Sequence, residues 1–291
     1  MTSSEQDIWS QWLLNRRFGG DPELMKKMFD YLYPVRDKVL SHIHLVENET
    51  LLDVGCGDGL ITFGALNKFE MCRVIFSDIS EDLLKHAEAL SQEMNVHDRC
   101  RFVRASADDL SMFEDVSVDA VTTRSVLIYV SGKQKAFNEF HRVLKAGGEL
   151  SIFEPISRFT GPEPPNLFEG YDITPVAELA QKLMALYQRI QPLDSDPMGD
   201  FDERDLVSQV EKAGFSEIHL ELQIEVKPHE NEDWDVFLHT TWAPKIPTLE
   251  EAMQEALAPA EVERFMNHLR PLVEAGQGTL RLAVAYLWAV K

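Results

Sequence analysis

A short glycine-rich segment early in the chain sets the strongest limit on its fold. The apolar run that begins at Leu51 ends in Asp53, and glycines follow at alternate positions, Gly55, Gly57 and Gly59. Glycine has no Cβ, so such a backbone can adopt positive φ angles and approach a bound molecule closely. The pattern predicts a β-strand that leads into a tight, ligand-facing loop. A glycine-rich hairpin loop is the alternative that needs no ligand.

The glycine spacing also separates two classes of nucleotide site. The dinucleotide fingerprint requires a glycine three residues after the second one. That position is Leu60 when counting starts at Gly55, and Thr62 when it starts at Gly57. Neither register predicts a nicotinamide or flavin site.

A second acid stands about twenty residues further along, at the end of another β-rich run. The run from Arg73 closes on Asp78 and Ile79. In α/β nucleotide sites an acid at this distance accepts hydrogen bonds from both ribose hydroxyls. We expect Asp78 in that role. Capping of the helix expected over Glu81 to Met94 is a compatible alternative, because Ser80 can supply the cap.

Strands and helices alternate from about residue 50 to 155, which is typical of a parallel sheet covered on both faces. Hydrophobic periodicity predicts a helix from Lys133 to Leu144, which should end at Gly147 and Gly148. The expected strands are Thr50 to Gly55, Arg73 to Ile79, Arg101 to Ser106, Val118 to Arg124, Gly148 to Glu154, Phe215 to Pro228 and Thr279 to Val290. The other expected helices are Ile8 to Leu14, Pro22 to His44, Val176 to Ile190, Leu249 to Ala256 and Pro259 to Glu274.

The motif that starts at Asp53, the acid Asp78 and the helix-to-strand junction from Phe140 to Leu150 resemble class I S-adenosylmethionine-dependent methyltransferases, in particular the small-molecule, type 11 or UbiE-like group. The resemblance implies an α/β Rossmann-like fold with a seven-stranded, mostly parallel sheet in the order 3-2-1-4-5-7-6. We expect one structural domain in three parts. They are an N-terminal helical lid (1–45), a cofactor-binding core (46–156), and substrate-covering insertions with the last two strands (157–291).

The same resemblance implies S-adenosylmethionine as the cofactor and S-adenosylhomocysteine as the product. We expect no metal, because no His, Cys and Asp spacing in the sequence is typical of a metal site. Asp53 would accept a hydrogen bond from the methionyl ammonium, and the glycine loop would offer its backbone to the methionyl part. In the adenine-binding turn Ser106 replaces the usual acid, which makes Ala107 and Asp108 the better contacts. The expected cofactor-binding residues are Asp53, Gly55, Cys56, Gly57, Asp78, Ile79, Ser106, Ala107, Asp108, Arg124 and Ser125.

The end of the fourth strand is informative because two motifs are missing there. It carries neither the Pro-Pro-aromatic motif of exocyclic-amine nucleic acid methyltransferases nor the magnesium-binding acid of catechol-type enzymes. The guanidinium of Arg124 suits a carboxylate of the cofactor or of the substrate, since its forked donors pair in bidentate fashion. A bridge from Arg124 to Glu154 is the alternative.

Three side chains are candidates for a catalytic base, namely Glu154, Tyr129 and Tyr171. None has a sequence neighbour that would form a dyad with it. We therefore expect proximity and alignment to supply most of the rate enhancement. We also expect residues 8–21 and 160–175 to close over the bound cofactor.

Composition limits the partners. The formal net charge of −21 disfavours nucleic acid and anionic membrane surfaces. Three cysteines without paired spacing and the absence of a signal-like N-terminus indicate a cytoplasmic protein, and a thiolate cluster of the arsenite methyltransferase type is not expected. The expected function is methyl transfer to oxygen or nitrogen of a small metabolite. A protein methyltransferase and a non-catalytic cofactor-binding regulator stay open, as does the choice between monomer and homodimer.

Overall fold

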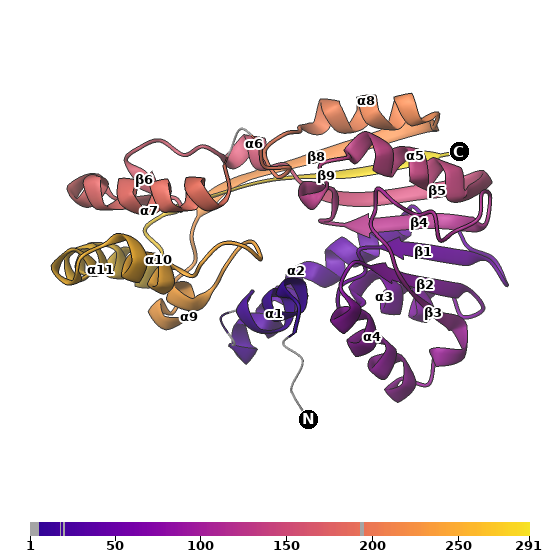
Figure 1. The fold of residues 1–291 in the computed structure, drawn as a ribbon, viewed down its shortest axis with the longest axis horizontal. Helices are drawn as coiled ribbons and strands as arrows, with labels where there is room; N and C mark the ends of the chain where they lie inside the picture. The colour runs from indigo at the N-terminus through magenta and orange to yellow at the C-terminus, as the bar shows by residue number, and fades with distance from the viewer. Residues whose placement is uncertain (1–5, 18, 20, 193–194) are drawn as a thin grey trace.

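The computed structural model describes residues 6–17, 19, 21–192 and 195–291. Seven of the strands in this part of the chain form a mixed sheet in the order β3-β2-β1-β4-β5-β9-β8 (Figure 1). The first five are parallel neighbours, and β9 is antiparallel to both β5 and β8. This confirms the predicted fold and strand order. The seven strands are β1 (Thr50–Val54), β2 (Arg73–Asp78), β3 (Cys100–Arg104), β4 (Val118–Arg124), β5 (Leu144–Pro155), β8 (Ser216–Pro228) and β9 (Thr279–Val290).

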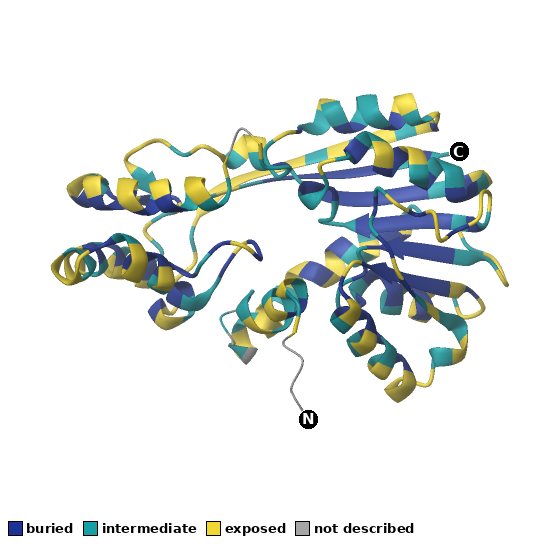
Figure 2. Ribbon diagram, viewed as in Figure 1, coloured by how far each residue is buried: buried dark blue, intermediate teal, exposed yellow. Residues whose placement is uncertain are grey.

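Both faces of the sheet are covered by helices, and its central strands are dark blue, that is buried, in Figure 2. In β4, Ala120 packs into the apolar cluster on one face and Val121 into the cluster on the other. Burial on both sides explains why the adjacent residues Ala120 and Val121, which point to opposite faces, are both apolar. The helices α2 (Pro22–Ser41), α3 (Leu60–Lys68) and α4 (Glu81–Glu93) pack on one face, and α5 (Lys133–Val143) and α8 (Glu203–Ala213) on the other.

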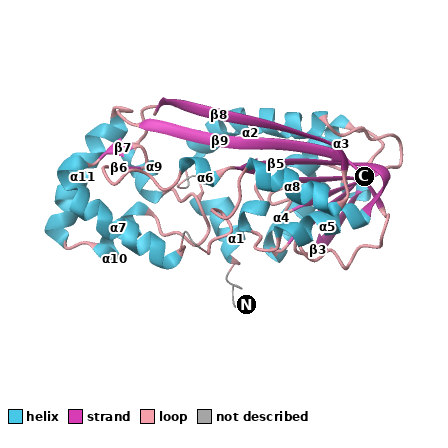
Figure 3. Cartoon of the chain, turned by 90° about the horizontal axis from the view of Figure 1, so that it is seen from above, coloured by secondary structure: helices cyan, strands magenta, loops and turns pink. Residues whose placement is uncertain are grey.

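A helical insertion has an apolar cluster of its own. Phe168, Leu183 and Phe265 are among its buried side chains. The strands β8 and β9 are longer than the parallel strands and extend beyond the ends of these strands to the insertion, which they join to the core (Figure 3). The insertion contains β6 (Leu167–Phe168), β7 (Tyr171–Asp172), η4 (Thr174–Val176), α7 (Ala177–Ile190), α9 (Trp234–His239), α10 (Leu249–Ala256) and α11 (Pro259–Glu274).

The N-terminal segment departs from a regular helix. A single turn, α1 (Ile8–Gln11), is followed by the π-helical turn η1 (Trp12–Arg16), where one continuous helix is predicted. The connection predicted from Arg16 to Asp21 includes Phe18 and Gly20, which lie outside the described residues. The remaining short elements are η2 (His97–Arg99), η3 (Leu127–Tyr129) and α6 (Ser157–Thr160).

Several predicted boundaries differ from the structure, and the largest difference is at β5, which begins at Leu144 and not at Gly148. The helix α5 ends at Val143 with an extended Leu144 as its cap, so Gly147 is not the cap and lies within β5 at a φ of +76°. The helix α2 ends at Ser41, three residues before the predicted end. The helices α8 and α9 and the β6–β7 hairpin are not among the predicted elements.

Candidate active site

A cavity of about 1320 Å³ lies where the carboxyl ends of the parallel strands meet the N-terminal segment and the insertion. Pockets for a single small molecule usually measure roughly 300–1,000 Å³. The cavity can therefore hold two ligands side by side. From the core it is lined by Gly55, Gly57, Asp78, Ile79, Ser106, Ala107, Asp108, Arg124 and Ser125; from the N-terminal segment by Trp9, Trp12, Leu13 and Arg17; and from the insertion by Phe168, Glu169, Met184, Tyr187 and His229, among others.

The glycine loop after β1 is shaped as the sequence predicts. Gly55, Gly57 and Gly59 have φ angles of +68°, +56° and +91°. A Cβ on Gly55 would lie 2.2 Å from a methyl group of Val126, whereas the nearest atom to a Cβ on Gly57 would be a methyl of Leu13 at 3.1 Å. The loop thus packs against Val126, after β4, at Gly55 and lies next to Leu13 of the N-terminal segment at Gly57.

Asp78 stands at the end of β2, beside this loop. Its Oδ2 accepts a hydrogen bond from the Gly57 N–H at 2.9 Å, and its Oδ1 accepts one from the Ser80 N–H at 2.9 Å. Ser80 caps α4 with its own hydroxyl, so Asp78 does not serve as that cap. Burial raises the pKa of Asp78, yet the residue lines the cavity and keeps acceptor capacity for ribose hydroxyls.

Asp53 and Cys56 lie behind the cavity wall. Asp53 is 1% exposed, and its Oδ1 accepts a hydrogen bond from the Thr122 hydroxyl at 2.8 Å. Its Oδ2 has no hydrogen-bond partner within the described chain, and burial raises its pKa to about 7. An orphaned carboxylate oxygen beside a glycine cradle fits an ammonium, reached directly or through a water. Burial holds the pKa of Cys56 well above its ordinary value, so it is not a thiolate.

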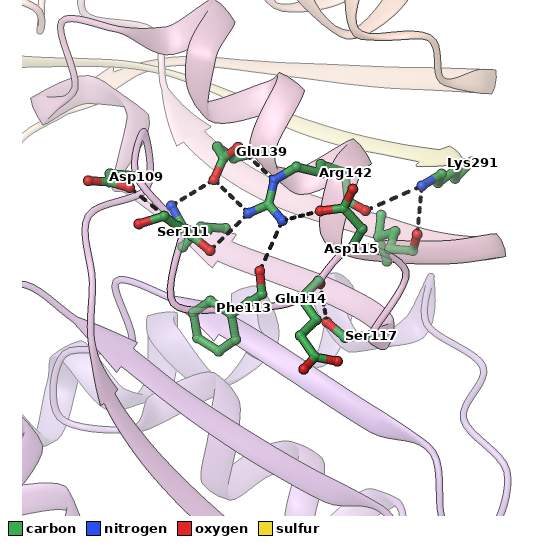
Figure 4. A network of polar contacts seen from close by, with 11 residues as sticks. Asp109, Ser111, Phe113, Glu114, Asp115, Ser117, Glu139, Arg142 and Lys291 are labelled. Carbon is green, nitrogen blue, oxygen red and sulfur yellow. Dashed lines mark hydrogen bonds and ion pairs between the residues drawn. The ribbon is translucent and has the colours of Figure 1, made fainter.

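The adenine turn after β3 is held by a polar network. The Ser106 hydroxyl donates to Asp108 Oδ1 at 2.5 Å, while Ala107 is buried at the cavity wall. Further along the loop, Arg142 of α5 donates to the carbonyls of Leu110 and Phe113 and to the carboxylates of Glu139 and Asp115 (Figure 4). Glu139 in turn accepts from the Leu110 N–H at 2.8 Å. This network fixes the loop that contains the turn.

Arginines face the cavity from two sides. Arg124 lies at the end of β4, where its backbone pairs with Phe153, and no hydrogen bond or ion pair joins its side chain to a described residue, so it does not bridge to Glu154. Arg17 approaches from the N-terminal segment, with its guanidinium carbon 5.2 Å from the Trp12 ring centroid. Burial and the charge of Arg124 lower the pKa of Arg17 to about 10. Arg17 stays cationic at neutral pH, and a second guanidinium lies at Arg124, so this part of the cavity favours an anionic group.

Glu154 occupies a position that does not suit a general base. It is fully buried, and its carboxylate accepts backbone N–H bonds from Val126, Leu127 and Ile128 at 2.9–3.2 Å. These bonds hold the turn that follows Arg124, where Ser125 has a φ of +55°. Burial raises the pKa of Glu154 to about 7. We propose a positioning role for Glu154, and its role as a catalytic base stays a prediction.

The two tyrosines differ in access. Tyr129 lines the cavity and makes an edge contact with Trp9, with ring centroids 5.0 Å apart. Burial raises its pKa to about 12, so its phenol is neutral. Tyr171 has no exposed surface and stacks on His229 inside the insertion, so the structure does not bring it to Glu154 or Tyr129. Direct contact of Tyr171 with a substrate conflicts with this burial.

Several residues that line the cavity were not predicted, because no local sequence pattern marks them as part of a site. Arg17 belongs to a short basic run with Arg16, but nothing in the sequence places Arg17 at the cavity while Arg16 pairs with Glu251. The acids Glu163, Glu169 and Glu232 come from three separate loops and line the same cavity only in the fold. Burial raises the pKa of Cys72 and Cys100 as well as that of Cys56, so the described cysteines do not form a thiolate site.

Two surveys of the described residues bear on the class of protein. No helix there is long and apolar enough to cross a bilayer. No group of three or more His, Cys, Asp or Glu side chains in the same part of the chain is arranged to hold a metal ion.

Comparison with known proteins identifies the family. Residues 52–152 match the family described as "Methyltransferase domain". The demethylmenaquinone methyltransferase of Lactiplantibacillus plantarum is 30% identical over 188 residues, which cover 64% of this chain and 78% of that protein. The ubiquinone/menaquinone biosynthesis C-methyltransferase UbiE of Rickettsia typhi is 24% identical over 217 residues, 72% of this chain and 87% of the relative. The YcgJ protein of Bacillus subtilis, at 15% identity, has the same fold with a TM-score of 0.54 over 90% of this chain and 98% of that one. The chain therefore belongs to the class I S-adenosylmethionine-dependent methyltransferases.

Proposed function

We propose that this methyltransferase acts on a small organic acceptor, which binds in the part of the cavity beyond the glycine loop. The observation that carries the proposal is the single continuous cavity of about 1320 Å³, which extends from Gly55 and Asp78 to the aromatic and acidic side chains of the insertion. That volume exceeds what one ligand of ordinary size needs. The relatives named above act on small molecules according to their names, which supports the same class of acceptor.

Oxygen or nitrogen of the acceptor is the expected methylation site, and carbon is the second candidate. The Rickettsia relative is named a C-methyltransferase. In this chain Trp9, Trp12 and Tyr129 form an aromatic wall, with ring centroids 5.0 and 6.3 Å from Tyr129 to the two tryptophans. Such a wall suits a planar aromatic acceptor, whose ring carbon or phenolic oxygen could take the methyl group.

The chain's own residues are suited to binding and alignment. The cofactor supplies a methyl carbon bonded to a sulfonium. We propose that Asp78 holds the ribose, that Asp53 serves the ammonium, and that Arg124 and Arg17 face the carboxylate of the cofactor. Trp9, Trp12 and Tyr129 would exclude water from the transfer point. A neutral Tyr129 phenol can orient an acceptor by donating a hydrogen bond, and alignment of this kind can contribute several kcal/mol, roughly 7–11 at the upper end.

Production of S-adenosylhomocysteine from S-adenosylmethionine tests the proposal. The protein is incubated with a metabolite extract from which macromolecules have been removed by ultrafiltration. We expect S-adenosylhomocysteine to form with this extract and not with the buffer alone. Gly57→Val is the control, because a branched side chain at a φ of +56° would strain the loop and intrude on Leu13. Product formed only with the macromolecular fraction would favour a protein substrate. Cofactor binding without product in either fraction would favour a regulator.

A further inference from the structure

A buried lysine lies behind the wall of the cavity. Lys133 is the first residue of α5, and it is 2% exposed. Lysine is almost never buried to this extent unless its charge is paired. A cation in the first turn of a helix also faces the positive end of the helix dipole, which is unfavourable. Local rules are broken in this way mainly at functional sites, so the position of this ammonium calls for a role beyond α5 itself.

The ammonium of Lys133 joins two segments of the chain. In the turn after β4 it donates to the carbonyl of Val130 at 3.0 Å. In the segment that leads into α8 it donates to the Pro197 carbonyl at 2.8 Å and to Asp200 Oδ1 at 2.5 Å. An ammonium has three donor hydrogens, so each of them has an acceptor. Lys133 therefore fixes the separation between the turn after β4 and the segment 195–200.

Both segments form part of the cavity wall. The lining residues are Tyr129, Val130 and Ser131 in the turn, and Asp196, Met198 and Gly199 in the segment 195–200. Within that segment Asp196 accepts the Met198 N–H with its side chain at 2.8 Å and the Gly199 N–H with its carbonyl at 3.1 Å. These bonds shape the segment, whereas the bonds to Lys133 attach it to the core. Apolar packing of Met198 against the core adds to this attachment but lacks direction.

The turn after β4 is held by charged groups at both ends. At its start, the carboxylate of Glu154 accepts the N–H groups of residues 126–128. At its end, the ammonium of Lys133 donates to the Val130 carbonyl. Hydrogen bonds to charged groups are roughly twice as strong as those between neutral groups. Tyr129 lies between these two anchors, so the place of its phenol in the cavity depends on both.

We propose that Lys133 is a positioning residue for methyl transfer, which holds Tyr129 and Met198 at the separation that the methyl acceptor requires. This rests on the proposed function. Lys133 does not line the cavity, so it acts through the two wall segments that it joins. Its three hydrogen bonds go to residues other than those proposed to hold the cofactor. Loss of the ammonium should therefore weaken the use of the acceptor and leave the binding of S-adenosylhomocysteine unchanged.

The variant Lys133→Met tests the attachment, because it removes the ammonium and keeps an apolar side chain of similar length. With S-adenosylhomocysteine bound, we expect amide hydrogen exchange over residues 195–200 to become at least about tenfold faster. The affinity for S-adenosylhomocysteine, measured by calorimetry, should stay within about twofold of the wild type. The matched control is Lys145→Met, which removes an ion pair with Asp119 away from the cavity lining and should change neither quantity.

Rate measurements test the role in methyl transfer. The initial rate of S-adenosylhomocysteine formation is measured against the amount of the ultrafiltered metabolite extract. For Lys133→Met we expect the half-saturating amount to rise at least about tenfold, since the wall no longer fits the acceptor. A purely structural role would instead lower the amount of active enzyme, and with it the maximal rate, and leave the half-saturating amount unchanged.

Three results would overturn the proposal. They are an unchanged exchange rate over residues 195–200, an unchanged half-saturating amount, and a loss of S-adenosylhomocysteine affinity in Lys133→Met. If that variant does not fold, Asp200→Asn replaces it, because Asp200 is 43% exposed and only one of the three bonds loses its charge. Exchange over residues 195–200 should then be at least about threefold faster, and equal exchange would refute the attachment. If the wild-type protein forms no product with the extract, the proposed function fails, and hydrogen exchange alone decides whether Lys133 holds the wall.

Discussion

Asp78 has two tasks at once, because it supports the glycine loop and faces the cavity. It accepts the Gly57 and Ser80 N–H groups and retains lone pairs toward the cavity. Asp78→Asn should weaken S-adenosylhomocysteine binding by about 1.5–3 kcal/mol, since one charged acceptor oxygen becomes a donor. Calorimetry measures the affinity, with the exposed acid Asp109 changed to Asn as the control. Unchanged affinity would move the ribose contact to another residue.

We expect Glu154 to stabilise the turn after β4 and not to act as a general base. Glu154→Ala leaves the N–H groups of Val126, Leu127 and Ile128 without their acceptor. We expect it to lower the free energy of unfolding by about 3 kcal/mol, and Glu154→Gln to lower it by less, because an amide oxygen still accepts. Urea unfolding checks this, with Glu149→Gln on the same strand as the control. If Glu154 is a base, Glu154→Gln will slow single turnover by about 10²–10⁴-fold and leave stability unchanged.

Tyr129 should not titrate in the working range of the enzyme. Burial raises its pKa to about 12, which keeps the phenol neutral through the neutral and mildly alkaline range. We expect Tyr129→Phe to slow turnover less than about a hundredfold and to leave the shape of the pH–rate profile unchanged between about pH 6 and about pH 10. Single-turnover rates across that range provide the measurement. A basic limb that disappears in the variant would show that Tyr129 does ionise.

The residue roles that could be predicted are those that depend on the local sequence pattern. Gly55 and Asp78 stand at strand ends that hydrophobic patterning reveals, and the structure brings both to the cavity. Glu154 could not be assigned in this way, because its partners Val126 to Ile128 lie 26–28 residues earlier and become its partners only in the turn after β4. The burial of Tyr171 depends on His229, 58 residues away, for the same reason.

At the scale of elements, Asp7 joins the N-terminal segment to the core through hydrogen bonds, beside the ring contacts of Trp9 and Trp12 with Tyr129. Asp7 caps α1 by accepting the Trp9 and Ser10 N–H groups, and its Oδ2 also accepts the Ser80 hydroxyl at 2.7 Å. This connection joins the proposed lid to the turn that carries Asp78. The second predicted lid segment, 160–175, packs Phe168 and Ile173 into the core of the insertion, so we restrict the lid proposal to the N-terminal segment.

Removing this connection should loosen the lid. Asp7→Ala loses a helix cap, which costs about 1 kcal/mol, and the bond to Ser80. With S-adenosylhomocysteine bound, we expect faster amide hydrogen exchange over residues 8–16. Asp21→Ala is the matched control, because Asp21 caps α2 through Glu23 and Leu24 and is not tied to α4 through a hydrogen bond of its side chain. Equal exchange in Asp7→Ala and the wild type would mean that the lid does not depend on this contact.

Element boundaries were predictable where periodicity and burial agree. The strand β4 and the helices α10 and α11 begin and end at the predicted residues, because apolar patterning and capping signals coincide there. The π-helical turn η1 has no distinct periodicity in a segment this short, and its residues fit an ordinary helix equally well. The extension of β5 back to Leu144 follows from its pairing with Val118, a tertiary contact that overrides the glycine signal.

For the molecule as a whole, ligand binding should raise the free energy of unfolding. A ligand that binds only the folded state at a concentration of 100 Kd stabilises it by about 2.7 kcal/mol. We expect S-adenosylhomocysteine to raise the midpoint of thermal unfolding and NAD to leave it unchanged, because the glycine spacing around Gly55 and Gly57 does not fit a dinucleotide. Thermal scans monitored by circular dichroism make the comparison. A rise with NAD alone would contradict the assignment of the cofactor.

The β8–β9 ribbon joins two parts of the chain that can change independently, the insertion and the core with its glycine loop. The whole insertion is encoded between the end of β5 and the start of β9, and only β8 with the preceding α8 interrupts it to rejoin the sheet. Mutations or exchanges within those segments can therefore change which compound is accepted while every residue of the glycine loop and β2 is left untouched. In such an arrangement the acceptor specificity can change during evolution while the binding site for the methyl donor is kept.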